Sequence, residues 1–141
     1  MKRILLALLL LAGPAFAAGT ITCTKTPGTV AVHVCSAVAD ATNATGTVSL
    51  MRGYIERVVT NPGDGGDAPT GVWTCGLTDA NGVDTLGAVI AGVSTSASVQ
   101  LYPMAQDTTT VVSPWVQSPL TMTCTGIGDA NTATVTLYVR E

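Results

Sequence analysis

The 141-residue chain carries little charge and few aromatic rings. Charged residues make up 11% of it and aromatic residues 4%, and it has one histidine and one phenylalanine. Basic residues are the scarcest charged class, six against nine acidic residues. A chain so poor in Lys and Arg has no electrostatic footprint for nucleic acid or an anionic membrane surface. The low charge and the abundance of the β-branched residues Thr and Val favour β-sheets over helices.

The residue types that enzymes and metal sites require are equally scarce. The only histidine, His33, has no nucleophile or carboxylate on its own strand, which favours a structural role. The four cysteines form no close C-x-x-C pair and therefore no typical zinc site. The glycine-rich segment 64–71 lacks the Lys and Ser/Thr of a phosphate-binding loop. We therefore expect a non-enzymatic protein with no catalytic residues, no cofactor and no metal site.

One acidic segment partly resembles a calcium-binding loop. Asp79, Asn81 and Asp84 occur in the pattern Asp-x-Asn-Gly-x-Asp. The glycine comes too early for an EF-hand, and the distal bidentate glutamate is missing. The dipeptide Asn81-Gly82 is also a strong hairpin-turn signal. A plain turn is the favoured interpretation, and calcium binding by this loop or by Asp64 and Asp67 is the open alternative.

Long apolar runs are absent except at the N-terminus. Lys2 and Arg3 precede an apolar run over 4–12, and Ala15-Phe16-Ala17 follows as a small-x-small cleavage signal. A membrane-spanning helix needs about 20 apolar residues, and Gly13-Pro14 interrupts this run. The pattern predicts a signal peptide over 1–17 and one mature domain over 18–141. We expect an exported protein, periplasmic or extracellular, with no membrane span after cleavage.

Four cysteines in an exported chain of this length predict two disulfides, with three possible pairings. Cys75 and Cys124 each share one face of a strand with bulky apolar residues, so both should point into the core. Cys23 and Cys35 fall on two neighbouring short strands. We predict the pairs 23–35 and 75–124, with the strands of Cys75 and Cys124 buried back to back. The alternative is that some of these residues are buried free thiols.

Alternating apolar and polar residues predict the strands. The clearest examples surround Trp73, Cys75 and Leu77, and the segment 134–139. Short strands at close spacing, separated by turn signals, predict an all-β fold. We expect a single β-sandwich, immunoglobulin-like or jelly-roll-like, of about 7–8 strands, or else a small barrel. The segment 86–93 is apolar but rich in glycine, and its periodicity does not distinguish a packed crossover from a short helical turn.

Five aromatic residues remain after the predicted leader is removed. Trp73 and Tyr138 lie among alternating polar neighbours and are expected to fill the core. Tyr54, Tyr102 and Trp115 are the candidates for surface binding, because exposed rings on one face could form a stacking platform.

Several segments resemble a group of small tailed-phage and prophage proteins encoded among virion structural genes. The resemblance covers about Gly53–Glu141 and is carried by the following segments: Gly53-Tyr54-Ile55-Glu56-Arg57-Val58-Val59-Thr60-Asn61-Pro62-Gly63, Ala68-Pro69-Thr70, 77–87, 118–122 and 134–140. The export signal and the cysteines depart from that group. The resemblance implies a non-enzymatic structural or attachment module.

Two functional hypotheses follow. The first is an exported phage-like structural, accessory or attachment domain, virion-associated, which binds a protein partner or itself. The second is a secreted or periplasmic carbohydrate-binding or adhesive sandwich, with a surface glycan as its ligand. An enzyme is the least favoured class.

Overall fold

The computed structural model describes residues 19–41, 43–63, 65–105 and 110–141. The predicted signal peptide lies outside these residues, as do Asp64 and Asp107. Ten strands and one 3-10 turn, η1 (Gly65–Asp67), are present in the described part. The strands are β1 (Gly19–Thr26), β2 (Val30–Val38), β3 (Asn43–Val48), β4 (Arg52–Asn61), β5 (Trp73–Thr78), β6 (Ile90–Val93), β7 (Val99–Leu101), β8 (Trp115–Gln117), β9 (Leu120–Thr125) and β10 (Thr132–Arg140).

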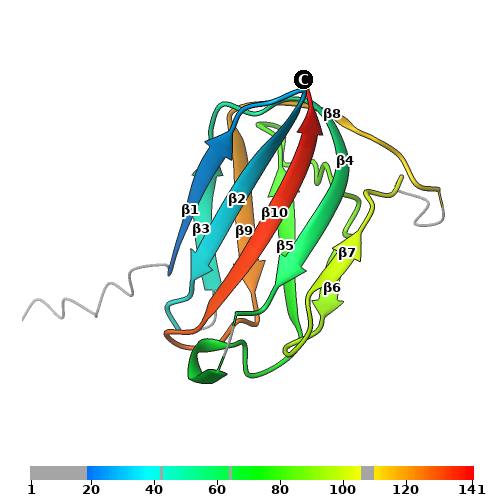
Figure 1. Cartoon of the computed structure of the whole chain (residues 1–141). Coiled ribbons are helices and arrows are strands. Elements are labelled where there is room, and N and C mark those ends of the chain that lie inside the picture. Colours follow the sequence, from blue (N-terminus) through cyan, green and yellow to red (C-terminus); the bar gives the residue numbers. More distant parts are fainter. Residues whose placement is uncertain (1–18, 42, 64, 106–109) are drawn as a thin grey trace, which may run out of the picture.

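The strands form one continuous sheet that curls into a nearly closed, barrel-like shape (Figure 1). Their order is β6-β5-β9-β3-β1-β2-β10-β4-β7, and β8 pairs with the other end of β4. The pairing is antiparallel except between β1 and β3, which run parallel over two residues. The prediction of an all-β fold is confirmed. Ten strands in one sheet replace the expected seven or eight, because several short strands extend the edges of the sheet.

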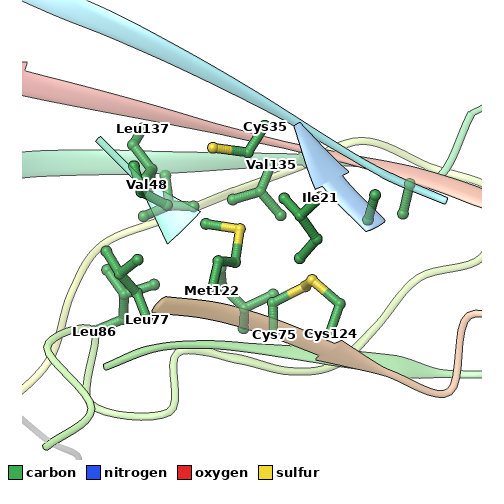
Figure 2. Packing of buried hydrophobic residues seen from close by; sticks show 14 of the residues in the cluster. Ile21, Cys35, Val48, Cys75, Leu77, Leu86, Met122, Cys124, Val135 and Leu137 are labelled. Carbon is green, nitrogen blue, oxygen red and sulfur yellow. A yellow bond between two sulfur atoms is a disulfide. The ribbon is translucent and has the colours of Figure 1, made fainter. Parts of the chain in front are cut away.

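Every second side chain along the strands points inward, and these side chains fill the interior of the barrel. In β9 the apolar residues Leu120, Met122 and Cys124 are buried and the intervening threonines are exposed. Ile21 and Val135 reach the same space from β1 and β10, so that Met122 lies between the two sides of the sheet (Figure 2). This core is built mainly from aliphatic side chains.

Both predicted disulfides are present, Cys23–Cys35 and Cys75–Cys124. The expectation that the strands of Cys75 and Cys124 lie back to back is wrong. β5 and β9 are hydrogen-bonded neighbours, and the two cysteines are directly opposite each other in register. The same is true of Cys23 and Cys35 on β1 and β2. Each disulfide therefore ties two adjacent strands together and does not bridge the core.

The segment after β5 completes the fold at one edge of the sheet. Ile90–Val93 forms the short strand β6 beside β5, so this part of the apolar segment 86–93 is a strand and not a helical turn. Trp73 is buried, as predicted, and its indole Nε1 donates a hydrogen bond of 3.0 Å to the carbonyl oxygen of Ser94. This bond anchors the start of β5 to the turn that leads from β6 to β7.

Candidate functional site: an aromatic outer face

The outward-facing side chains of β4, β7, β8 and β10 form a surface rich in aromatic and arginine residues. We call it the aromatic face and define it by Arg52, Tyr54, Glu56, Arg57, Gln100, Tyr102, Trp115, Gln117, Tyr138 and Arg140. Tyr54, Tyr102 and Trp115 are among the large apolar side chains that the fold leaves exposed. The face lies on the side of the barrel formed by β10 and β4 (Figure 1).

A β-bulge in β4 determines which of its residues point outward. Strict alternation would place Arg57 inside, beside Ile55. The register between β4 and β10 shifts between Tyr138 and Val139, leaving Glu56 as the extra residue. Glu56 and Arg57 are both half-exposed as a result, whereas Val58 is buried. A bulge re-aims side chains in this way, and here it adds the guanidinium of Arg57 to the face.

Trp115 and Tyr54 form the most exposed part of the face. They are cross-strand partners on β8 and β4. Their ring centroids are 5.1 Å apart and their planes lie at 69°, an edge-to-face contact. Aromatic pairs prefer this geometry to a parallel sandwich. Trp115 is 50% exposed and Tyr54 is 43% exposed. Because they stand on paired strands, the two rings have fixed positions relative to each other.

Arg140 on β10 extends the Trp115–Tyr54 pair into a row of three side chains across β8, β4 and β10. It is the cross-strand partner of Tyr54 on the side away from Trp115. Its guanidinium lies 5.7 Å from the centre of the Tyr54 ring, within the range of a cation–π contact. Arg140 Nε also donates to Glu56 Oε1 at 3.0 Å. Exposed ion pairs contribute little stability, so the effect of this pair is mainly to orient the guanidinium.

A second row of side chains crosses β10, β4 and β7. The guanidinium of Arg57 lies 3.8 Å from the centre of the Tyr138 ring, and its Nη1 donates to Gln100 Oε1 at 3.3 Å. Gln100 Nε2 in turn donates to the Tyr102 hydroxyl. The prediction that Tyr138 fills the core is wrong. Val135, Leu137 and Val139 are buried, whereas Tyr138 shares the opposite face with the threonines of β10 and is half-exposed.

The face also concentrates positive charge. Beyond the predicted leader the sequence has three arginines, Arg52, Arg57 and Arg140, and all three point outward here. Glu56 is the one carboxylate within the face. Arg52 forms no ion pair with any described residue. The surface is thus locally basic although the chain as a whole is acidic.

His33 lies inside the barrel, away from the aromatic face. It is 1% exposed, and its Nε2 has no hydrogen-bond partner among the described residues. Its cross-strand neighbours are Lys25 on β1 and Leu137 on β10. Burial lowers the pKa of His33 below its ordinary value; Lys25 lowers it further, and Glu141 raises it. Lys25 itself pairs with Glu141 and donates to the carbonyl oxygen of Leu50 at 3.1 Å.

The acidic segment after β5 uses its carboxylates to hold backbone amides. Asp79 Oδ1 accepts from the amides of Asn81 at 2.8 Å and Val83 at 3.0 Å. Asp84 accepts from Leu77, Leu86 and Ala88. Gly82 has a φ of 78°, as a tight turn requires. This geometry supports the turn interpretation of the segment. Among the described residues, no group of three or more His, Cys, Asp or Glu could hold a metal ion.

The fold brings together some of the predicted surface residues and separates others. Tyr54 and Trp115 are in contact, whereas Tyr102 belongs to the second row and reaches it through Gln100. Sequence reasoning missed Arg57, Tyr138 and Arg140. Tyr138 and Arg140 had a usable signal, since both fall on the threonine side of the alternation in β10. Arg57 had none, because its orientation depends on the bulge.

Comparisons with protein families, with curated proteins and with solved structures found no match to this chain. Its resemblance to tailed-phage structural proteins therefore stays a prediction. Within the described ranges, no helix has the length and apolar character needed to cross a membrane.

Proposed function

We propose that this chain is an exported, non-enzymatic attachment domain of the phage-like structural or accessory kind, and that it binds through its aromatic face. The observation that carries the proposal is the Tyr54–Trp115 pair, two half-exposed rings fixed on paired strands. Exposed aromatic and arginine side chains are the residue types that dominate binding energy at interfaces. Keeping these side chains in a fixed arrangement requires a rigid scaffold, which the barrel supplies.

Two disulfides support the exported part of the proposal. Disulfides form and persist in oxidising compartments such as the periplasm or the cell exterior. Both pairs tie neighbouring strands of the barrel. The predicted leader over 1–17 supports the same conclusion independently.

We also group the domain with immunoglobulin-like or jelly-roll-like sandwiches, since β2, β10 and β4 form a layer in front of β9 and β5 (Figure 1).

The location of His33 favours binding over catalysis. A general base must come within hydrogen-bond reach of the proton that it removes. The only histidine of the chain is buried inside the barrel, on the opposite side of the sheet from the exposed aromatic and arginine side chains. The side chains of the aromatic face are suited to stacking and hydrogen bonding.

Attachment can be tested with the exported protein and a bacterial envelope fraction. Cosedimentation of the wild type with the envelope should be compared with that of a Tyr54→Ser/Trp115→Ser variant. Because both residues are exposed, the variant should keep its circular dichroism spectrum and its melting temperature. Val38→Ser is the matched control, since Val38 is 45% exposed on β2 but lies outside the face.

We expect the double variant to lose binding and the control to keep it. A wild-type protein that remains in the supernatant and elutes as a partnerless monomer would overturn the proposed function. Equal cosedimentation of all three proteins would show that attachment uses another surface.

A further inference from the structure

We propose that the ligand of the aromatic face is an anionic polysaccharide, with a sugar ring stacked on Trp115 and its acidic groups bound by Arg52 and Arg140. This inference rests on the proposed attachment function and specifies the chemical class of what is attached.

The exposed ring surface of Trp115 is available to stack against a sugar ring. Tyr54 is flanked by Arg140 on one side and Trp115 on the other, so part of its ring is already in contact. Trp115 has Tyr54 as its only ring contact in the described residues, and half of it is exposed. The face of an aromatic ring is electron-rich. It therefore attracts the polarised C–H groups on the flat side of a pyranose, the same electrostatic preference that governs cation–π contacts.

The size of the exposed ring surface favours a sugar over a protein. A fully buried aromatic side chain accounts for about 150–250 Å², so two half-exposed rings offer on the order of 200 Å². A stable protein interface takes about 800 Å² from each partner. Arg140 separates the ring pair from the next exposed apolar residue in that row, Val30 on β2. The uninterrupted apolar area thus suits one or two sugar rings.

The charge of the face determines what kind of sugar it suits. Arg52 on β4 and Arg140 on β10 lie beside the ring pair, Arg57 lies in the second row, and Glu56 is the single carboxylate of the face. A guanidinium has five N–H donors, and Arg140 uses its Nε for Glu56. Its remaining donors can bind a carboxylate or phosphate on a sugar, in the paired geometry that arginine favours. Arg52 lies beside Gln117, whose amide adds donors and an acceptor for hydroxyl groups.

Three polymers separate the contributions of ring and charge. Polygalacturonate has sugar rings and carboxylates, dextran has rings without charge, and polyglutamate has carboxylates without rings. Binding of each can be followed by fluorescence, because the chain has two tryptophans and Trp73 is buried. A change in emission therefore reports on Trp115. Alginate and hyaluronate extend the test to other acidic polysaccharides.

We expect an acidic polysaccharide to bind at least about tenfold more tightly than dextran or polyglutamate. Trp115→Ala and Arg140→Gln should each weaken that binding by about tenfold when it is measured by cosedimentation or calorimetry. A higher salt concentration should also weaken the binding of the wild type to the acidic polysaccharide. Trp115→Phe should retain more affinity than Trp115→Ala, because a ring remains.

Three results would overturn the inference. One is no binding to any of the acidic polysaccharides. Another is equal binding to polyglutamate, which would indicate attraction by charge alone, and a third is equal binding to dextran. Treating the envelope fraction separates this failure from failure of the attachment function. Binding that survives periodate oxidation of the envelope but is lost after protease treatment would identify a protein partner and leave the attachment function standing.

Discussion

Cys75 and Cys124 lie directly opposite each other on the neighbouring strands β5 and β9, and a disulfide joins them. Cys23 and Cys35 have the same relationship on β1 and β2. The two disulfides are therefore similar in local setting but different in the length of chain that they close. Their sequence separations are 49 and 12 residues.

This difference predicts their order of importance for stability. In the chain-entropy account, closing the longer loop contributes about 4 kcal/mol to the free energy of unfolding and closing the shorter loop about 3 kcal/mol. We expect Cys75→Ala/Cys124→Ala to lose more stability than Cys23→Ala/Cys35→Ala. Urea denaturation of the two double variants under the same conditions measures this. A larger loss in the variant of the shorter loop would contradict the entropic account.

His33 should make the barrel sensitive to acid. Its pKa in the folded protein lies below the ordinary value of 6.5, mainly because the ring is buried. Below that value the unfolded chain binds a proton more readily than the folded protein, so stability falls as the pH decreases. The stabilising contribution is complete above about pH 6.5 and is lost on acidification towards the lower pKa of the folded state.

Denaturation midpoints at about pH 7.5 and about pH 5 test this. We expect a clear decrease in the wild type and a much smaller one in His33→Leu, which removes the titrating ring and its unpartnered Nε2. Asp79 provides no competing signal in this range. Its pKa is lowered from 3.8 by backbone hydrogen bonds, so its contribution is lost only in stronger acid. A wild-type midpoint that does not change between the two pH values would refute the assignment.

Gly53 allows β4 to pack closely against β10 beneath the aromatic face. Its φ is +141°, and an added Cβ would lie 2.3 Å from the carbonyl oxygen of Arg140. A side chain there would strain β4 and push it away from β10, beside Tyr54. We expect Gly53→Ala to lower the free energy of unfolding by at least about 2 kcal/mol.

Gly76 supplies the matched control for this substitution. It lies in β5, and a Cβ added there would have no atom within 4 Å, so Gly76→Ala should change stability by no more than about 0.5 kcal/mol. Thermal or urea unfolding of both variants measures the contrast. Equal stability of the two would mean that β4 and β10 are less closely packed at Gly53 than the structure indicates.

Much of this architecture can be predicted from the sequence because alternation and cysteine placement are local signals. Trp73, Cys75 and Leu77 alternate with small or polar residues, and this correctly identified a strand with one buried side. The predicted export signal suggested disulfides, and the positions of Cys23 and Cys35 on successive strands led to the correct pairing. Asn81-Gly82 likewise identified a turn by its backbone chemistry.

The features that escaped prediction depend on how strands pair. A cysteine that points inward can have its partner beside it or across the core. The predicted back-to-back arrangement of β5 and β9 was wrong for this reason. The bulge at Glu56 reverses the alternation in β4, and no local pattern marks it. The same reversal places Arg57 beside Tyr138, which explains why the second row of the aromatic face was not anticipated.

The acidic turn after β5 should be stabilised by its own backbone and not by calcium. Asp84 accepts hydrogen bonds from three amides, those of Leu77, Leu86 and Ala88. Asp84→Ala would leave these amides without their acceptor and should cost about 1–3 kcal/mol. Addition of calcium or of a chelator should leave the wild-type melting temperature unchanged. A calcium-dependent increase that Asp84→Ala abolishes would instead establish a cation site in this loop.

The most direct test of the central claim, that the aromatic face is the binding surface, is the accessibility of Trp115 to acrylamide in the free and the envelope-bound protein. Trp115 is half-exposed and Trp73 is buried, so quenching in the free protein should come from Trp115 alone and disappear in Trp115→Phe. We predict that binding to the envelope protects Trp115 from the quencher. Bound protein whose Trp115 is quenched as strongly as in the free state would contradict the account.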